Sequence, residues 1–268
     1  MEILEFSECF PDEPGRPIFT IVVYKIDDQY FTARISGRCI RDSEITQSRL
    51  ENVVTIPKTA FQPQYSEEDF NLAPSPGSLY VKRPSLISYY HIDRIKSDRI
   101  AQDVLREAQV CEILRLHPHS NIVEYIGCET EDDRISGLCF TKYRESLMQR
   151  LNPGSLGKRA FAASSHLDRA WCNKILIGVK SALDHLHSLG LVHNDLNPSN
   201  IMLDHEDTPK LIDFGSCRYI GEILRNVGRT YPWYDEQVQY ANKDNDLDAL
   251  SEIGAWMKGE LDGFKFEE

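Results

Sequence analysis

Two short acidic loops, about eighteen residues apart, constrain this sequence more than any other feature. The first spans residues 193–200 and reads H-N-D-L-N-P-S-N, and the second spans residues 213–215 and reads D-F-G. Apolar residues recur at helical spacing from Asp168 to Leu189, and Gly190 follows as a residue that commonly ends helices. The sequence therefore predicts a long helix followed by two acidic loops, with a short apolar β-hairpin between the loops.

The two loops resemble the signature motifs of protein kinases. H-N-D-L-N-P-S-N is similar to the catalytic loop H-R-D-L-x-x-x-N, and L-I-D-F-G-S is similar to the magnesium-binding D-F-G motif. The chain as a whole resembles compact fungal serine/threonine-protein-kinase-like proteins with a degenerate glycine-rich loop, on the runs V-K-R-P-S-L and H-P-H-x-N-I-V. The resemblance covers roughly residues 54–258 and implies a protein-kinase-like fold.

The resemblance also implies roles for the polar residues of the loops. Phosphoryl transfer needs a carboxylate that orients the acceptor hydroxyl and accepts its proton, and Asp195 matches that catalytic residue. Asn200 and Asp213 match the oxygen ligands of Mg²⁺, with ATP as the phosphoryl donor. A lone Asp or Asn in a loop is usually a turn or cap residue, but three in this order indicate chemistry. The residues expected to support the site structurally are His193, Phe214, Gly215 and Asp246.

Upstream residues resemble the nucleotide-binding parts of the family. Val81-Lys82 is similar to the end of the V-A-I-K strand, whose lysine binds phosphates and pairs with a helix glutamate. We expect Lys82 to contact ATP and Glu107 to be its partner, with Glu112 as the alternative. The adenine-binding hinge, with Phe140 as gatekeeper, is expected at Phe140, Thr141, Lys142 and Tyr143.

The order of the predicted elements indicates an α+β fold. Alternating residues at 17–36 predict a β-hairpin. The proline-rich stretch 43–77 predicts a connector or a covering loop with weak order. The helix-forming stretches are 98–116 and 168–189, and the further strands are predicted at 79–82, 122–126, 138–143, 201–203 and 210–212.

We therefore predict a two-lobed protein-kinase-like fold with a small, mainly β N-lobe that contains one long helix, and a mainly helical C-lobe. The predicted domains are a β-rich extension at 1–53, the N-lobe and hinge at 54–143, and the C-lobe at 144–268. The sequence ends about twenty residues after Asp246, so a C-lobe truncated after the Asp246 helix is expected.

Four departures from the family pattern bear on activity. No G-x-G-x-x-G precedes Lys82, where Pro74-Ser75-Pro76-Gly77-Ser78 stands instead. Asn194 replaces the arginine of H-R-D, so control by a phosphate on the activation loop is not expected. Asn197 replaces a lysine that offers a cation to the γ-phosphate, for which Arg218 is a candidate substitute. The short C-lobe is the fourth departure.

The segment between D-F-G and Asp246 contains G-R-T-Y-P-W at 228–233, where the activation segment is expected. Two interpretations of Thr230 remain open: a residue that contacts an acceptor side chain, and a loop threonine of no special role.

Charge and composition limit the partners. The formal net charge of −12 opposes binding to nucleic acid, and no apolar run is long enough for a membrane helix. Because the N-terminus is acidic, unlike a signal peptide, we expect an intracellular, cytoplasmic protein, with the nucleus left open. Seven scattered cysteines predict reduced thiols rather than a zinc site: Cys9, Cys39, Cys111, Cys128, Cys139, Cys172 and Cys217.

The leading hypothesis is an ATP- and Mg²⁺-dependent protein serine/threonine kinase that acts on an unidentified protein substrate. A pseudokinase, which acts as a binding or scaffold protein with weak or no catalysis, is the first alternative. A small-molecule phosphotransferase is the second, because such enzymes share the H-x-D-x-x-x-x-N spacing.

Overall fold

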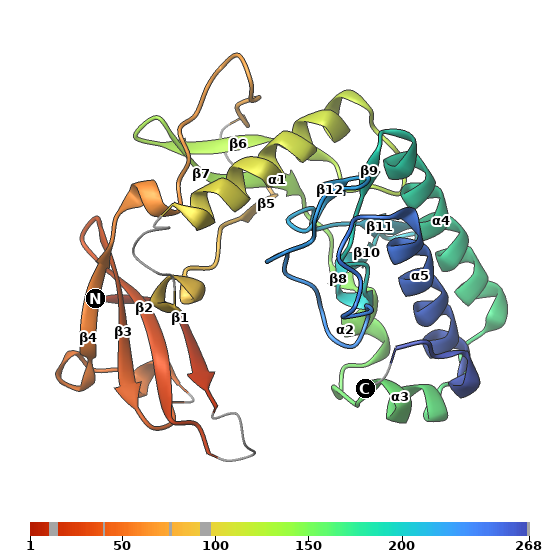
Figure 1. Ribbon diagram of the computed structural model, residues 1–268, viewed down its shortest axis with the longest axis horizontal. Coiled ribbons are helices and arrows are strands. Elements are labelled where there is room, and N and C mark those ends of the chain that lie inside the picture. The colour runs from red at the N-terminus through yellow and green to blue at the C-terminus, as the bar shows by residue number, and fades with distance from the viewer. Residues whose placement is uncertain (11–15, 40, 75–76, 92–97, 267–268) are drawn as a thin grey trace. The chain divides into compact units, whose positions relative to one another are not determined.

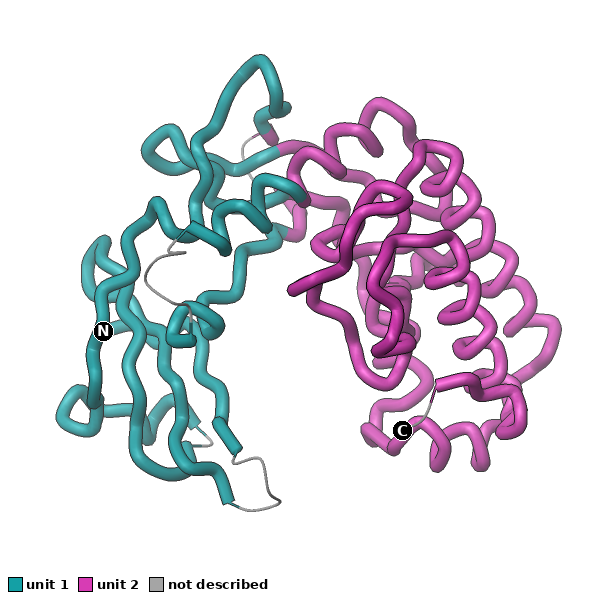
Figure 2. The backbone as a smooth tube through the Cα atoms, in the orientation of Figure 1, with its two compact units in different colours: residues 1–72, 81–106, 128–138 teal, residues 73–80, 107–127, 139–268 magenta. Residues whose placement is uncertain are grey.

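The chain divides into two compact units, each assembled from segments that are separate in sequence (Figure 2). The computed structural model describes residues 1–10, 16–39, 41–74, 77–91 and 98–266. Unit 1 comprises residues 1–72, 81–106 and 128–138, and unit 2 comprises residues 73–80, 107–127 and 139–268. The predicted domain boundaries at 53 and 143 follow a different division and stay predictions.

Unit 1 begins with a four-stranded antiparallel meander in the order β1-β2-β3-β4 (Figure 1). The strands are β1 (Glu2–Cys9), β2 (Phe19–Ile26), β3 (Gln29–Ser36) and β4 (Glu51–Ile56). The hairpin predicted at 17–36 is confirmed as β2 and β3. The turn between the two strands contains Asp27, whose φ is 52°. The connector predicted at 43–77 is wrong in one part, because it contains β4 and the 3₁₀ turns η1 (Asp42–Glu44), η2 (Gln47–Arg49) and η3 (Lys58–Ala60).

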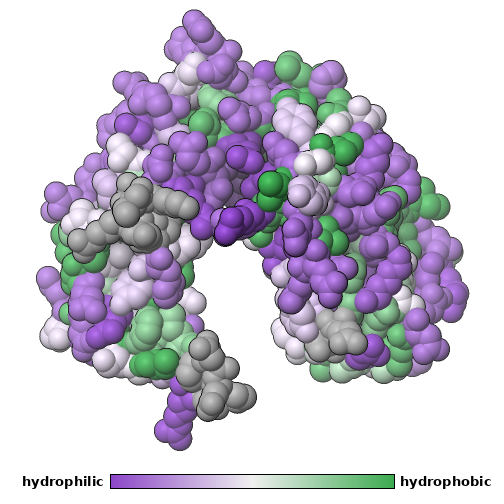
Figure 3. Space-filling model, in the orientation of Figure 1, coloured by the Kyte–Doolittle hydropathy of each residue, from purple (hydrophilic) through white to green (hydrophobic). Residues whose placement is uncertain are grey.

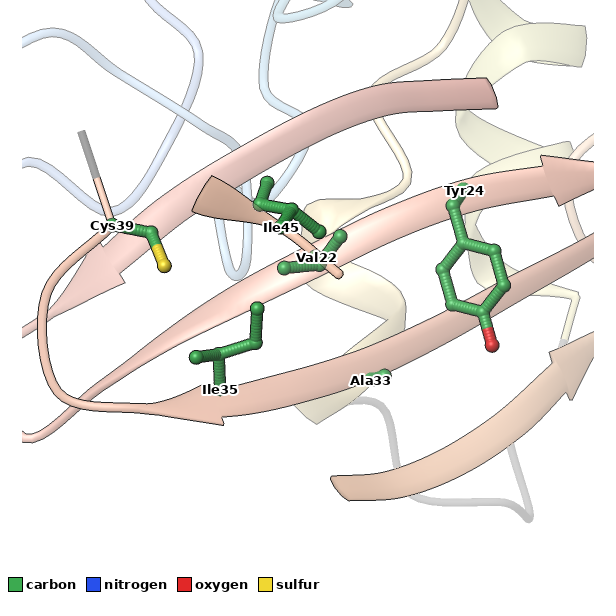
Figure 4. Packing of buried hydrophobic residues seen from close by; sticks show 6 residues of the cluster. All are labelled: Val22, Tyr24, Ala33, Ile35, Cys39 and Ile45. Carbon is green, nitrogen blue, oxygen red and sulfur yellow. The ribbon is translucent and has the colours of Figure 1, made fainter. Parts of the chain in front are cut away.

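The meander has apolar cores on both faces because successive residues of a strand point to opposite sides. Val22 and Tyr24 of β2 pack with residues of β3 and of the segment after it, as Figure 4 shows. Val23, between them, instead packs with Phe61 and Leu86. The sheet is therefore covered on each side by later parts of unit 1.

A second sheet has the order β5-β7-β6. Its strands are β5 (Leu79–Lys82), β6 (Tyr125–Glu131) and β7 (Arg134–Thr141). β5 lies as predicted, but β6 and β7 are shifted from the predicted ranges 122–126 and 138–143. The strands continue into polar residues up to a turn at Asp132 and Asp133, whose φ angles are 51° and 57°. Each predicted range covers only part of its strand, and buried residues such as Cys128 and Ile135 lie outside those ranges.

The predicted helix at 98–116 is confirmed as α1 (Arg99–Leu116), which follows the 3₁₀ turn η4 (Ile87–His91). α1 and the strands β6 and β7 each run from one unit into the other.

Helices dominate the rest of unit 2. They are α2 (Leu147–Leu151), α3 (Lys158–Ser164), α4 (Arg169–Ser188) and α5 (Lys243–Lys258), with the 3₁₀ turns η6 (Pro198–Asn200) and η7 (Leu261–Gly263). The short strands are β8 (Glu145–Ser146), β9 (Leu191–Val192), β10 (Ile201–Leu203), β11 (Pro209–Leu211) and β12 (Arg218–Tyr219), in sheets ordered β11-β10-β8 and β12-β9. The predicted α+β class is confirmed.

Helix α4 begins and ends where its capping residues predict. The Asp168 carboxylate accepts hydrogen bonds from the backbone N–H groups of Ala170 and Trp171, at 3.4 and 3.0 Å. Gly190 has a φ of 79°, a left-handed conformation in which glycine is free of the usual steric penalty. Between these ends, one face of α4 is buried, and the loop that follows is thereby fixed to a rigid element.

Polar residues cover much of the surface in the view of Figure 3. Within the described parts of the chain, no helix has the length and apolarity needed to cross a membrane. Six of the seven cysteines are buried and fill small spaces in the protein interior, and Cys9 is partly exposed.

Candidate active site

The two acidic loops lie next to each other in unit 2. The backbone N–H of Ile212 donates to the carbonyl of Asn200 at 3.0 Å, which links the end of one loop to the start of the other. His193 Nε2 lies 3.0 Å from the Ile212 carbonyl oxygen, and its Nδ1 accepts from the backbone N–H of Asp195 at 3.3 Å. These partners place the imidazole proton on Nε2. The ring also contacts Phe214, edge to face at 5.7 Å.

Asp246 supports the first loop from inside the protein. Its carboxylate is fully buried and accepts hydrogen bonds from the backbone N–H groups of His193 and Asn194, at 2.9 and 2.8 Å. His187 Nε2 of α4 lies 2.8 Å from the same carboxylate. Asp246 therefore connects α4, α5 and the loop, which matches its expected structural role.

The Asp195 carboxylate lies at the centre of a hydrogen-bond network. Oδ1 accepts from the backbone N–H of Thr230 at 2.7 Å and from the Asn197 amide at 3.3 Å. Oδ2 accepts from the Thr230 hydroxyl at 3.2 Å and from the Asn200 amide at 3.1 Å. A hydroxyl group therefore already lies within hydrogen-bond distance of the carboxylate, at the separation that a proton transfer to Asp195 requires.

Burial raises the pKa of the Asp195 carboxyl above its ordinary value, and the neighbouring Asp213 carboxylate acts in the same direction. His193 and the two hydrogen bonds from Thr230 favour the ionised form and offset part of this effect. A carboxylate with a raised pKa is a stronger base than an ordinary aspartate, which suits a group that accepts a proton.

Asn200 and Asp213 supply the oxygen atoms that suit Mg²⁺. The amide NH₂ of Asn200 donates to the backbone carbonyl of Asp195 at 2.9 Å and to Asp195 Oδ2. The amide oxygen of Asn200 is therefore oriented away from Asp195. Asp213 has a φ of 64°, and its Oδ1 accepts from the Gly215 backbone N–H at 3.2 Å.

Mg²⁺ is commonly held by one or two protein ligands together with phosphate oxygens and water. Within the described residues there is no group of three or more His, Cys, Asp or Glu side chains that could hold a metal by itself. The amide oxygen of Asn200 and the carboxylate of Asp213 fit a metal ion whose other ligands are phosphate oxygens of a nucleotide and water.

The two candidate glutamates of α1 have different surroundings. Glu107 Oε1 accepts from the backbone N–H of Phe214 at 3.2 Å, and its side chain is nearly buried. Glu112 Oε2 instead pairs with Arg115 on the same helix at 2.7 Å. Glu107 therefore reaches the D-F-G loop. Its pairing with Lys82, which belongs to unit 1, stays a prediction.

The expected hinge residues lie at the end of β7 and directly after it. Phe140 is buried and packs against Tyr125, with ring centroids 5.5 Å apart. The backbone N–H of Thr141 donates to the Glu124 carbonyl at 3.0 Å. Lys142 and Tyr143 follow the strand, and adenine binding by these four residues stays a prediction.

The residues that depart from the kinase pattern have structural partners. Asn194 occupies the left-handed region at φ 64°, which Asn tolerates, and its amide donates to the carbonyls of Val192 and Ser216 at 3.0 and 3.2 Å. The Asn197 amide bridges Asp195 to the Thr230 hydroxyl, the latter at 3.2 Å. These two asparagines stabilise the loop through hydrogen bonds, but they are uncharged and offer no cation to a phosphate.

Arg218, considered as a substitute cation, is 7% exposed, and its Nη1 donates to the carbonyls of Gly215 and Cys217 at 3.1 and 2.7 Å. Its guanidinium therefore binds the backbone of the D-F-G loop.

Three contributors to the site were given no role in the sequence analysis. His187 contacts Asp246, the Asn245 amide donates to Asn194 Oδ1 at 3.0 Å, and the Ser216 hydroxyl donates to the Gly228 carbonyl. No local pattern marks them, because each acts on a residue far away in sequence. Thr230 contacts Asp195 through both its backbone and its hydroxyl, so it is not a loop threonine without a role.

Comparison with known proteins agrees with this geometry. The family model described as protein kinase domain matches residues 87–250, which is more than half of the chain. The chain therefore belongs to the protein kinase domain family, and its α+β fold is kinase-like.

Similar curated proteins are kinases of larger size. Serine/threonine-protein kinase STY17 of Arabidopsis thaliana is 28% identical over 62% of this chain and 29% of its own length. Mitogen-activated protein kinase kinase kinase 5 of the same plant is 25% identical over 68% of this chain and 26% of its own length. Serine/threonine-protein kinase Tao of Drosophila melanogaster is 30% identical over 59% of this chain and 14% of its own length. The chain spans less than a third of each of these relatives.

Proposed function

We propose that this chain is an ATP- and Mg²⁺-dependent protein serine/threonine kinase. The single observation that carries the proposal is the environment of Asp195, a partly buried carboxylate with a hydroxyl 3.2 Å from Oδ2 and a raised pKa. Membership of the protein kinase domain family and the serine/threonine kinases among the similar proteins support the reaction class. The phosphoacceptor is a serine or threonine hydroxyl of a protein.

The polar residues of the site have three kinds of task in this reaction: proton transfer, metal binding and support of the catalytic loop. Asp195 orients the acceptor hydroxyl through one carboxylate oxygen and takes its proton as the oxygen attacks the γ-phosphate. Asn200 and Asp213 would hold Mg²⁺, which neutralises charge on the phosphate oxygens. Asn197 and Asn200 fix the Asp195 carboxylate through their amide groups, and His193 and Asp246 fix the loop backbone.

A pseudokinase is the second candidate, and one observation favours it. Gly77 is the only glycine between residues 54 and 82, so the stretch before Lys82 lacks the repeated glycines whose backbone N–H groups cover phosphates in kinases. Ser75 and Pro76 of that stretch lie outside the described residues. A chain that holds phosphates weakly would keep the fold and bind a partner without rapid transfer.

The test is transfer of the γ-phosphate from ATP–Mg²⁺ to a generic basic protein and to the chain itself. Asp195→Ala and Asp213→Ala are each expected to lower the rate by about a hundredfold or more, because they remove the base and a metal ligand. The matched control is Asp184→Ala, which removes an exposed α4 carboxylate that pairs with Lys180 on the same helix.

Transfer that survives in Asp195→Ala at the wild-type rate would contradict the assignment of the base. A wild-type chain without transfer and without nucleotide binding would favour the pseudokinase. The cytoplasmic location expected from the sequence stays a proposal.

A further inference from the structure

A buried ion pair in unit 2 lies outside the residues that the kinase motifs identify. Lys158, the first residue of α3, is 5% exposed and pairs with Glu252 of α5, which is fully buried. Removing two charges from water is costly, and buried lysines are rare unless they are paired and hydrogen-bonded. The surroundings of this pair therefore indicate what it holds in place.

Three acceptors surround the three N–H donors of the Lys158 ammonium group. They are the Glu252 carboxylate, the Pro232 carbonyl at 3.0 Å and the Phe266 carbonyl at 3.4 Å. Two aromatic rings also lie near the ammonium group, with the ring centroids of Trp233 at 5.0 Å and of Phe264 at 4.7 Å from Nζ. The ammonium group is thus a fixed junction between three separate segments.

Glu252 completes the junction on the other side. Its carboxylate accepts hydrogen bonds from the backbone N–H groups of Lys265 and Phe266, at 2.7 and 3.3 Å. The pair therefore binds the segment 264–266 through both partners, and it binds Pro232 through the lysine alone.

Pro232 belongs to the segment that contacts Asp195. Two residues before it, Thr230 donates to Asp195 through its backbone N–H at 2.7 Å and through its hydroxyl at 3.2 Å. One residue after it, Trp233 donates its backbone N–H to the Thr230 carbonyl at 2.9 Å and packs edge to face on Trp256 of α5. A displacement of Pro232 would consequently also displace Thr230, because both residues belong to the same backbone turn.

We infer that Lys158 and Glu252 are positioning residues that hold segment 228–233 so that Thr230 meets Asp195, and that segment 264–266 is the strap that encloses this junction. The inference rests on the proposed function only for its effect on phosphoryl transfer. A hydrophobic pair of similar volume often gives equal or greater stability than a buried ion pair. What the charged pair adds here is a donor for the Pro232 carbonyl.

The first experiment is native-state hydrogen exchange of the wild-type chain at low denaturant concentrations. The amides of Thr230 and Trp233 are expected to open in the same cooperative step as the amides of Lys265 and Phe266, which Glu252 holds. Thr230 and Trp233 amides that open in a separate step would overturn the inference. This measurement uses no variant, so it stands whether or not the pair tolerates substitution.

The second experiment compares the wild type with the double variant Lys158→Met/Glu252→Gln. The variant removes both charges together, and Gln keeps an acceptor for the backbone N–H groups of the strap. Exchange at Thr230 and Trp233 is expected to become at least about tenfold faster, because one hydrogen bond from a charged donor is lost. Exchange inside α4, as at Ile175, is expected to stay unchanged.

Lys180→Met is the matched control, because Lys180 is exposed and pairs with Asp184 on the same helix. A folded double variant with wild-type exchange at Thr230 would show that the pair has no positioning role. In transfer assays the double variant is expected to lower kcat with the KM for ATP unchanged. A wild-type chain without transfer would contradict the proposed function, and the exchange result would still decide the inference.

Discussion

At the scale of single residues, Thr230 is one of the groups that set the basicity of Asp195, together with burial, His193 and Asp213. Burial raises the pKa of Asp195, whereas the backbone and hydroxyl hydrogen bonds of Thr230 lower it by stabilising the ionised carboxylate. The two effects oppose each other, and burial prevails. In the proposed reaction Asp195 acts as a base only when it is ionised, so activity is expected to fall as the pH drops through its pKa.

Thr230→Ala should raise the pKa of Asp195 further, because the variant loses the hydroxyl donor and keeps the backbone N–H. The acidic limb of the pH dependence of kcat/KM is then expected to move to higher pH, since kcat/KM reports the free enzyme. Thr230→Ser retains a hydroxyl and serves as the control. An acidic limb that stays in place in Thr230→Ala would show that the 3.2 Å contact has no influence on the base.

The contribution of Asp195 to folding stability has the opposite sign. Because its pKa is raised in the folded state, the protonated form favours folding. The contribution to the free energy of unfolding is therefore fully present below the unfolded value of 3.8 and is lost as the pH rises through the folded pKa. Chemical denaturation of the wild type and of Asp195→Ala at several pH values measures this contribution as the difference between the two slopes, and Asp184→Ala is the control.

At the scale of elements, helix α4 and strand β11 approach each other closely at Gly178. A Cβ atom at this position would lie 2.5 Å from Pro209 Cγ and 2.9 Å from Asn121 Nδ2. Gly178→Ala is expected to lower the free energy of unfolding by about 1–3 kcal/mol, even though alanine favours a helix by about 1 kcal/mol. Denaturant unfolding of the variant measures the difference.

Gly254 of α5 is the matched control for this prediction. A Cβ atom there would lie 3.4 Å from Leu176 Cδ1, an ordinary van der Waals contact. Gly254→Ala is therefore expected to be neutral or to stabilise the protein by up to about 1 kcal/mol. Equal effects of the two substitutions would contradict the close approach of α4 and β11 at Gly178.

The elements also show how much of the fold could be predicted from sequence. Helix α4 and the β2–β3 hairpin were predictable because their periodicity, caps and turn are local. Strands β1 and β4 were missed because they are the two edges of the meander and pair on one side only. β4 buries only Ile56, so its sequence lacks a strong hydrophobic alternation.

The same distinction between local and distant contacts applies to the candidate site. Asp195, Asn200 and Asp213 could be found from sequence because they lie at fixed spacings within two short motifs. The contacts of Asp195 with Thr230, 35 residues away, arise only when the chain folds. Lys158 and Glu252, 94 residues apart, share no sequence pattern.

At the scale of the whole molecule, the predicted ATP ligands are divided between the two units. Lys82 belongs to unit 1, whereas Asn200, Asp213 and the expected hinge belong to unit 2. A ligand that binds only the folded chain raises the free energy of unfolding by RT ln(1 + [L]/Kd), about 2.7 kcal/mol at a hundredfold excess over Kd. ATP–Mg²⁺ is therefore expected to raise the melting temperature of the wild-type chain.

Substitutions in each unit then show whether both take part in binding. Lys82→Met and Asp213→Ala are each expected to reduce the shift, because they remove the proposed phosphate contact of unit 1 and the proposed metal ligand of unit 2. Lys180→Met, on the exposed face of α4, is expected to keep the full shift. A full shift in Lys82→Met would mean that unit 2 holds the nucleotide without Lys82. No shift in the wild type would mean that a kinase fold with a single glycine between residues 54 and 82 does not bind the nucleotide, which is the pseudokinase outcome.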